Sequence, residues 1–281
     1  MQENLQPKRL LVVGDIHGYL DKLTELMEQV QPMEHDKVVF LGDYIDRGPD
    51  SRGVIEYLID FRQRFPQTVF LRGNHEQMLL DALVEDRIAK GQHSEGMRKR
   101  LRDYPSSNYF SIFSTSDTER YMANDGNSTL RNYGGDFGDI LKEHENFLES
   151  CRFWHRETVM VADIASGIKQ QEFIFVHAGI RPGKPIEDQT PEDLLWIRDE
   201  FLDSKDNFGG SIIVHGHSFE YEEVPVIRTN RIGMDNAAYM DPQISHYYED
   251  IPGKPGQLVC LDVISKESWR SCATKLWIRD S

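Results

Sequence analysis

Polar side chains that could do chemistry follow five apolar stretches of this sequence, each where the apolar run ends. Aspartate, histidine, asparagine and arginine are residue types that bind divalent metal ions, transfer protons or hold anions. A single aspartate after a strand is commonly a turn former, but five such clusters are hard to explain by turns alone. The clusters are Asp15 with His17; Asp43, Asp46 and Arg47; Asn74 with His75; His177; and His215 with His217.

The candidate metal ligands are carboxylates, imidazoles and one amide oxygen, and none of them is a thiolate. Such a donor set suits divalent ions such as manganese, iron or zinc. Several carboxylates and imidazoles together exceed what one tetrahedral ion needs, whereas two ions that share a bridging carboxylate would use all of them. The residue types therefore predict a dinuclear metal centre.

Four nearly continuous apolar stretches predict strands that are covered on both faces. Helical spacing of apolar residues after Asp21 and after Ser51 predicts a helix behind each of the first two stretches. This order favours a largely parallel sheet, in which binding residues gather at the carboxyl ends of the strands. The stretches are 10–13, 38–41, 68–71 and 173–176, and the final third is expected to form strands over 212–214, 224–227, 258–263 and 275–278.

Segment 89–138 is different from the rest of the chain, because it is polar and interrupted by glycine and proline. We predict an insertion or cap with some helix packed on the core, which either shapes substrate choice or is a tolerated surface elaboration. A helix is expected over 139–151, and a hairpin is expected to pair 158–164 with 172–179. Residues 1–281 are interpreted as one domain that carries this insertion.

The formal net charge of −15 argues against a general nucleic-acid-binding surface, because phosphate backbones are held by clustered Lys and Arg. A locally cationic site for a small anion remains compatible with that charge. No apolar run approaches the roughly 18 residues of a membrane helix, and the N-terminus holds no apolar signal region. We therefore expect a cytoplasmic protein that contacts neither nucleic acid nor membrane.

Five short blocks resemble the signature of the metallophosphoesterase superfamily, and specifically of its phosphoprotein phosphatase (PPP) branch. In chain order they read GDIHG, GDYIDRGP, RGNHE, HAG and HGHS. The block LLWIRDEFL, residues 194–202, is similar to an element of bacterial serine/threonine protein phosphatases. The resemblance covers residues 10–218 except the insertion. It implies an α/β fold in which a central β-sandwich of mixed sheets is flanked by helices.

The family pattern, carried over residue by residue, implies two divalent ions, with manganese favoured and iron or zinc as alternatives. The histidine of HGHS that matches the pattern is the second one, so His215 is left as a neighbour or an indirect support of the ligands. The implied ligands are Asp15, His17 and the bridging Asp43 for the first ion, and Asp43, Asn74, His177 and His217 for the second.

The resemblance also implies a mechanism in which a hydroxide that bridges the two ions attacks phosphorus directly, without a phosphoenzyme. His75, oriented by Asp46, would be the general acid that protonates the leaving alkoxide. Arg47, Arg198 and Asn74 would hold the phosphoryl oxygens. Without the family pattern, the two arginines would pass for surface charges paired with neighbouring acids.

Three functions compete at this stage. The leading one is a metal-dependent phosphomonoesterase that acts on phosphoserine or phosphothreonine in proteins. The alternative is a symmetrical dinucleoside polyphosphate hydrolase, because diadenosine tetraphosphatases share the same core blocks. A non-catalytic protein that binds phosphorylated partners is the third, and the completeness of the site speaks against it. After HGHS the resemblance weakens, and Tyr239 lies in the comparable region without a clear alignment.

Overall fold

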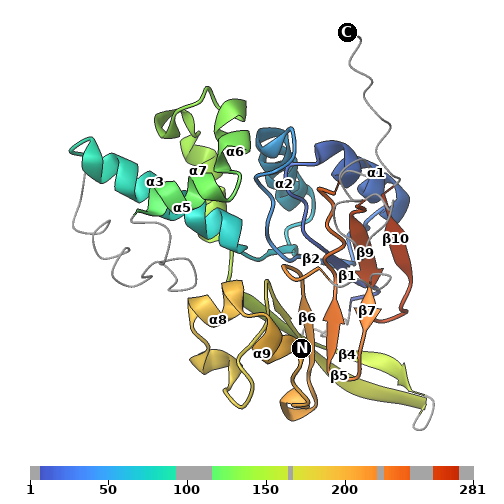
Figure 1. The fold of residues 1–281 in the computed structure, drawn as a ribbon. Coiled ribbons are helices and arrows are strands. Elements are labelled where there is room, and N and C mark those ends of the chain that lie inside the picture. Colours follow the sequence, from blue (N-terminus) through green and yellow to red (C-terminus); the bar gives the residue numbers. More distant parts are fainter. Residues whose placement is uncertain (1–6, 93–115, 164–166, 220–224, 241–255, 272–281) are drawn as a thin grey trace, which may run out of the picture.

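Two five-stranded sheets lie face to face, and helices cover their outer sides (Figure 1). This computed structural model describes residues 7–92, 116–163, 167–219, 225–240 and 256–271. The first sheet has the order β10–β9–β1–β2–β3 and the second β4–β5–β6–β8–β7. The strands are β1 (Leu10–Val13), β2 (Lys37–Phe40), β3 (Val69–Phe70), β4 (Trp154–Asp163), β5 (Gly167–Val176), β6 (Ile212–His215), β7 (Val226–Ile227), β8 (Arg231–Gly233), β9 (Val259–Asp262) and β10 (Ser268–Arg270).

Helices fill the connections, as the spacing of apolar residues predicts. The helix after β2 begins where expected, because Asp50 caps it by accepting a hydrogen bond from the N–H of Gly53 at 2.8 Å. The α-helices are α1 (Leu20–Val30), α2 (Ser51–Arg64), α3 (Asn74–Ala89), α5 (Asp117–Ala123), α6 (Gly126–Asn132), α7 (Lys142–Ser150), α8 (Pro191–Trp196) and α9 (Asp199–Leu202). Short 3₁₀ turns are η1 (Phe137–Asp139), η2 (Ile186–Asp188) and η3 (Phe208–Gly210).

The strand pairing confirms both the parallel centre and the mixed character of the sheets. In the first sheet, β1, β2 and β3 are parallel, while β9 and β10 add antiparallel pairs at one edge. In the second sheet, β5, β6 and β8 are parallel, while β4 and β7 are antiparallel to their neighbours. The predicted α/β fold, a sandwich of mixed sheets flanked by helices, is therefore confirmed.

Alternation along β1 explains why its apolar run is continuous. Leu10 and Val12 belong to the buried cluster between the two sheets, while Leu11 and Val13 belong to the cluster under the helices. Successive side chains of a strand point to opposite faces, so a strand buried on both sides needs apolar residues at every position. This doubly buried strand fixes the starting point of the loop that carries Asp15.

The other predicted strands and helices that fall within the described residues are present, with shifts at their ends. The hairpin exists, but its strands are longer than expected, since β4 already pairs with β5 at Trp154. The helix expected over 139–151 begins three residues later, because Ile140 and Leu141 are extended after η1. The strand expected over 275–278 lies outside the described residues.

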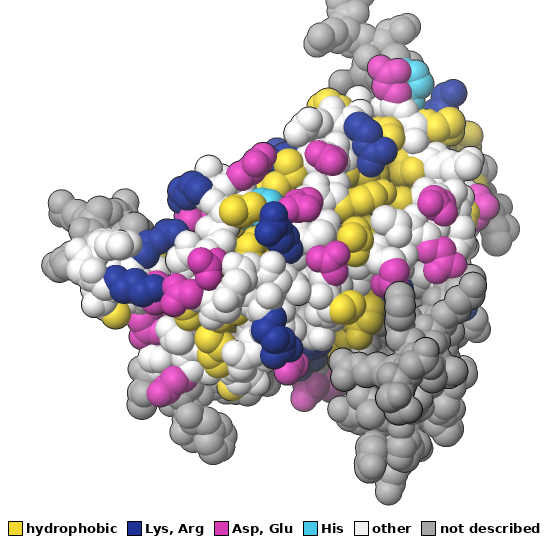
Figure 2. All heavy atoms as spheres, turned by 90° about the horizontal axis from the view of Figure 1, so that it is seen from above, with side chains coloured by type: hydrophobic (Ala, Val, Ile, Leu, Met, Phe, Trp, Pro, Cys, Tyr) yellow, Lys and Arg dark blue, Asp and Glu magenta, His cyan; other side chains and the backbone are white. Residues whose placement is uncertain are grey.

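The described part of the predicted insertion forms two short helices, α5 and α6, which we call the α5–α6 segment (residues 117–132). It lies beside α3 and α2 (Figure 1). Residues 93–115 lie outside the described ranges. None of the helices within those ranges is both long and apolar enough to cross a membrane. On the face drawn in Figure 2, Lys and Arg side chains are interspersed with Asp and Glu side chains.

Candidate metal centre and phosphate pocket

The loops that follow β1, β2, β3, β5 and β6 bring the predicted side chains together. They line a pocket of about 110 Å³, to which Trp196 and Asn124 also contribute. Asp15, Asp46 and His177 are buried directly behind the pocket wall. The predicted site residues that line the pocket itself are His17, Asp43, Arg47, Asn74, His75, Arg198 and His217.

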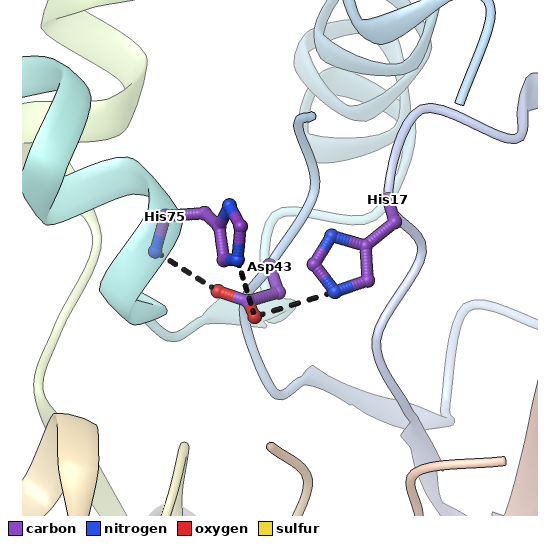
Figure 3. A group of neighbouring side chains, drawn as sticks. All are labelled: His17, Asp43 and His75. Atoms are coloured by element: carbon purple, nitrogen blue, oxygen red, sulfur yellow. Dashed lines mark hydrogen bonds and ion pairs between the residues drawn. The ribbon is translucent and has the colours of Figure 1, made fainter. Parts of the chain in front are cut away.

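Asp43 lies between two imidazoles (Figure 3). Its Oδ2 is 3.5 Å from His17 Nε2 and 4.0 Å from His75 Nε2, and its Oδ1 accepts the backbone N–H of His75 at 3.1 Å. His17 Nδ1 donates to the carbonyl of Ile45 at 3.0 Å, which leaves the lone pair on Nε2. The three side chains are buried, and their possible ligand atoms lie within 4.8 Å of one another.

Asp43 also belongs to a second buried group, with His177 and His217. His177 Nδ1 donates to the carbonyl of Leu41, so the Nε2 lone pair faces Asp43 Oδ1 at 3.4 Å and Asn74 Oδ1 at 2.9 Å. His217 Nδ1 is 3.0 Å from the same Asn74 oxygen. Several lone pairs therefore face one another, and a cation between them would stabilise this arrangement.

One orphaned acceptor agrees with a metal at this place. Asp15 Oδ1 is a buried carboxylate oxygen without a hydrogen-bond partner among the described residues. Burial and the nearby charges of Asp235 and Asp43 raise the pKa of Asp15, so cationic charge would stabilise this corner. Asp15 Oδ2 accepts the backbone N–H of His217 at 2.8 Å. Asp15 lies outside the two compact groups, and its place among the ligands stays a prediction.

The candidate ligand histidines are held in the form that binds metals. Burial lowers the pKa of His17, His177 and His217. The guanidinium of Arg47 lowers the pKa of His17 further, and that of Arg198 lowers the pKa of His217. Neutral imidazoles are the coordinating species, so no proton has to be removed from them before an ion binds.

His75 and Asp46 form a buried pair beside this centre. His75 Nδ1 is hydrogen-bonded to Asp46 Oδ2 at 2.7 Å, which turns Nε2 toward the pocket. Burial alone would lower the pKa of His75, but the charge of Asp43 and the hydrogen bond to Asp46 raise it overall. The arrangement therefore suits a histidine that gives a proton to a group in the pocket.

Arg47 lines the pocket between two histidines. Its Nη1 donates to His17 Nε2 at 2.9 Å, and its Nη2 lies 3.3 Å from His75 Nε2. The ring of Tyr239 packs on the guanidinium at 4.0 Å and edge-on against His17 at 5.3 Å. Tyr239, which the sequence left unaligned, is thus part of this site and fixes the plane of Arg47.

Arg198 is the second guanidinium that lines the pocket. Its Nη1 donates to the carbonyl of His217 at 3.2 Å and to Ser218 Oγ at 3.3 Å. Neighbouring Glu200 is instead paired with Arg181 at 2.7 Å. Glu200 therefore does not neutralise Arg198, contrary to the alternative in which Arg198 is a helix-face charge paired with this neighbour.

Five site residues have left-handed backbone conformations, which are uncommon outside glycine. Each costs on the order of 1 kcal/mol and persists only where the surrounding structure holds it. The hydrogen bond from the backbone N–H of His17 to the carbonyl of Asp43, at 2.8 Å, helps to hold two of these residues in place. The five are His17 (φ 49°), Asp43 (51°), Asp46 (71°), Arg47 (67°) and His217 (60°).

Glu76 is a supporting residue that our sequence reasoning missed, although it is the last letter of RGNHE. Its Oε2 accepts the N–H groups of Asp43 and Gly73, both at 2.8 Å, and its Oε1 accepts those of Tyr44 at 2.8 Å and Ile45 at 3.3 Å. Burial and the charge of Asp43 raise the pKa of Glu76 to about 7, while the four donors favour its ionised form. One buried carboxylate thus joins the loops after β2 and β3.

The α5–α6 segment supplies further residues that no motif indicated. The Tyr121 hydroxyl and the Thr129 hydroxyl both donate to Asp46 Oδ1, at 2.9 and 2.6 Å. Asn124 lines the pocket. Because these residues follow no strand and have no ligand spacing, the sequence held no signal for them. The described part of the segment packs against α3 and α2.

The two histidines of HGHS occupy different places. His217 lies in the second buried group, whereas the His215 ring packs against Phe201 at 5.0 Å. His215 Nδ1 is 3.1 Å from the carbonyl of Gly216, and its Nε2 is 3.4 Å from Arg231. His215 therefore supports the strand end from behind, on the side away from the pocket.

Two mixed sheets that carry a buried Asp–His centre at their strand ends define a metal-dependent phosphoesterase architecture. The chain belongs to the calcineurin-like phosphoesterase family, whose model matches residues 8–246. This family uses a dinuclear divalent metal centre and hydrolyses phosphoric esters.

Individual relatives share part of the sequence or the fold. A protein of Schizosaccharomyces pombe named "putative serine/threonine-protein phosphatase" is 37% identical over 105 residues. That match covers 37% of this chain and 31% of the relative, so the chain spans about a third of its length. A solved structure described as "a putative diadenosine tetraphosphatase" aligns at a TM-score of 0.55 with 17% identity and covers 96% of both chains. A hypothetical protein of Pyrococcus horikoshii aligns at 0.52 with 12% identity, over 95% of this chain and 89% of its own.

Proposed function

We propose that this protein is a metal-dependent phosphomonoesterase of the PPP branch that acts on phosphoserine or phosphothreonine in proteins. One observation carries the proposal: a single pocket of about 110 Å³ is lined by the His75 imidazole, by two guanidinium groups and by the candidate metal ligands. A phosphoryl group needs cationic donors on its oxygens and a proton for its leaving group, and this pocket offers both.

The ligands that would hold two ions surround Asp43. When bound, the ions would neutralise phosphate charge and lower the pKa of a water molecule, with manganese favoured over iron or zinc. His17 cannot give its Nε2 lone pair to an ion and to Arg47 at once, so Arg47 would be free to turn to a phosphoryl oxygen. The proposed ligands are Asp15, His17 and Asp43 on one side, and Asp43, Asn74, His177 and His217 on the other.

The remaining residues would bind the phosphoryl group and supply the proton. Arg47 and Arg198 would hold its oxygens through forked N–H donors, and the Asn74 amide would contact it beside the metal ligands. His75 would donate the proton on Nε2 to the leaving alkoxide, while Asp46 keeps Nδ1 protonated and the ring in place. No serine or cysteine nucleophile takes part in this proposal.

Two substrate classes need to be separated. The name of the Schizosaccharomyces pombe relative supports a protein phosphatase, and the description of the structure matched over 96% of this chain supports a dinucleoside polyphosphate hydrolase. Rates should be measured for the manganese-loaded protein on phosphoserine peptides and on diadenosine tetraphosphate. A preference for the dinucleotide by orders of magnitude would reverse our ranking.

A cytoplasmic location and one catalytic domain over residues 1–281 remain predictions.

The His75→Asn variant tests the mechanism. We expect about 10²–10⁴-fold slower hydrolysis of esters with basic leaving groups, at unchanged metal content. Esters with weakly basic leaving groups should be affected much less, because their departure needs little proton transfer. Equal losses on both kinds of ester would contradict the role of His75, and absence of turnover in the wild-type protein would favour a non-catalytic phospho-partner binding protein.

A further inference from the structure

We propose that Tyr121 and Thr129, from the α5–α6 segment, are positioning residues that act through Asp46 to hold His75 in its proton-donating geometry. This inference rests on the proposed role of His75 as the general acid. It gives the segment a part in catalysis, where the sequence left open a cap for substrate choice or a surface elaboration.

One oxygen of the Asp46 carboxylate binds His75, and the other binds the α5–α6 segment. Its Oδ2 is bonded to His75 Nδ1 at 2.7 Å, while its Oδ1 accepts the hydroxyls of Tyr121 at 2.9 Å and Thr129 at 2.6 Å. Asp46, Tyr121 and Thr129 have no exposed surface. Water therefore cannot replace either hydroxyl without rearrangement, and each bond fixes the carboxylate plane.

The Thr129 hydroxyl holds the backbone of Asp46 as well as its side chain. The N–H of Asp46 points at Thr129 Oγ1 and Ser51 Oγ, both at 3.0 Å, and those two oxygens are 2.9 Å apart. The one proton of Thr129 goes to the carboxylate, so its oxygen accepts from the N–H and from the serine hydroxyl. These bonds restrain Asp46 at its left-handed φ of 71°.

The α5–α6 segment is itself anchored, so its hydroxyls are presented at fixed positions. Asn132 Oδ1 accepts the N–H of Ser51 at 2.8 Å, and its Nδ2 donates to the carbonyl of Pro49 at 2.9 Å. The Tyr121 ring is seated against Gly126, where an added Cβ would come within 2.5 Å of the ring. The segment thus forms hydrogen bonds with the backbone of the loop that carries Asp46 and with the Asp46 side chain.

The test compares two aryl esters that differ in how much their leaving group needs a proton. Phenyl phosphate releases a more basic phenolate than p-nitrophenyl phosphate, so faulty general acid catalysis slows hydrolysis of the first ester more. For Tyr121→Phe and for Thr129→Val we expect kcat on phenyl phosphate to fall about 3- to 10-fold, and for the double variant about 30-fold or more. On p-nitrophenyl phosphate the rates should stay within about two-fold, and KM should be unchanged for both esters.

Matched variants separate positioning from general damage to the segment. Thr129→Ser keeps the hydroxyl and should recover the wild-type rate on phenyl phosphate to within about two-fold. Tyr133→Phe removes another buried hydroxyl of the same region, bonded to His144 at 2.7 Å, and should leave the ratio of the two rates unchanged. Metal content and melting temperature are measured for every variant.

Two results would overturn the inference. Tyr121→Phe, which removes one oxygen atom, could leave the ratio of the two rates as in the wild type, or it could change this ratio no more than Tyr133→Phe does. If Thr129→Val fails to fold, Tyr121→Phe alone decides. The His75→Asn variant separates failure of this inference from failure of the proposed function. If His75→Asn selectively slows hydrolysis of phenyl phosphate and Tyr121→Phe does not, the positioning role is refuted and the proposed general acid role of His75 stands.

Discussion

The strand-end loops and the α5–α6 segment contribute to the same site in different ways. The loops place side chains in the pocket itself, and most of these side chains lie within a few residues of a strand end. The segment contributes Asn124 to the pocket wall, but Tyr121 and Thr129 act from behind through Asp46, from positions 75 and 83 residues further along the chain. Most residues that line the pocket are therefore encoded by short motifs, whereas their support comes from tertiary packing.

The loop side of this comparison is tested most strongly by Asp43→Asn. The change removes the negative charge shared by both candidate ligand groups, so we expect loss of bound metal and a fall in phosphatase rate of about 10³-fold. Elemental analysis of the purified protein and steady-state rates on p-nitrophenyl phosphate measure this. Asp60→Asn, on the exposed side of α2, is the control. A variant that retains the full metal content would break the assignment of Asp43 as the shared ligand.

Glu76→Gln tests whether the loops are supported locally. Glutamine offers one acceptor oxygen where four backbone N–H groups now bind, and its amide would face donors, so about 2–3 kcal/mol of unfolding free energy should be lost. Urea denaturation monitored by circular dichroism gives the value. The exposed Glu28→Gln on α1 should change it little. Equal stability of the two variants would show that the loops hold themselves.

Gly126→Ala tests the segment by packing, without removing a hydroxyl. The new methyl group would lie 2.5 Å from the Tyr121 ring, which must shift, at a cost of about 1–2 kcal/mol in stability. If the segment positions the acid, hydrolysis of phenyl phosphate should slow more than hydrolysis of p-nitrophenyl phosphate. A thermal melt and the two rates are the measurements. An unchanged melting temperature would mean that the ring does not depend on this glycine.

Glu157, far from both regions, supplies the smallest expected effect. A hydrogen bond with His155 and an ion pair with Lys37 at 2.7 Å hold its pKa at about 2 against the opposing effect of burial. The stabilisation that ionised Glu157 contributes is complete above pH 4.5 and is lost as the pH falls toward 2. Because the side chain is partly exposed, solvent screening limits this contribution to roughly a fraction of a kcal/mol. Unfolding free energies of wild type and Glu157→Gln should converge over this range. Metal content and activity near neutral pH should not differ.

The sequence was informative where one local rule decides the structure. Doubly buried strands such as β1 need unbroken apolar runs, and parallel strands of one sheet end at one edge, so the meeting of Asp15, Asp43 and Asn74 could be anticipated. Sequence patterns could not show that Glu76 accepts from four backbone N–H groups, because three of these groups lie in the loop after β2 and become neighbours of Glu76 only when the chain folds. Tyr121 and Thr129 were hidden for a stronger reason. Their partner Asp46 is distant in sequence, and a polar segment with glycine reads as a surface loop.

The carboxylate of Glu76 has a consequence for protein engineering. Because it binds the N–H groups of Gly73 in one loop and of Asp43, Tyr44 and Ile45 in another, the two loops are a single mechanical unit. Grafting either loop alone onto a different scaffold would leave buried donors unmatched and let the left-handed turn at Asp43 relax. A designer who wishes to transplant this site must move both loops and the first turn of α3 together.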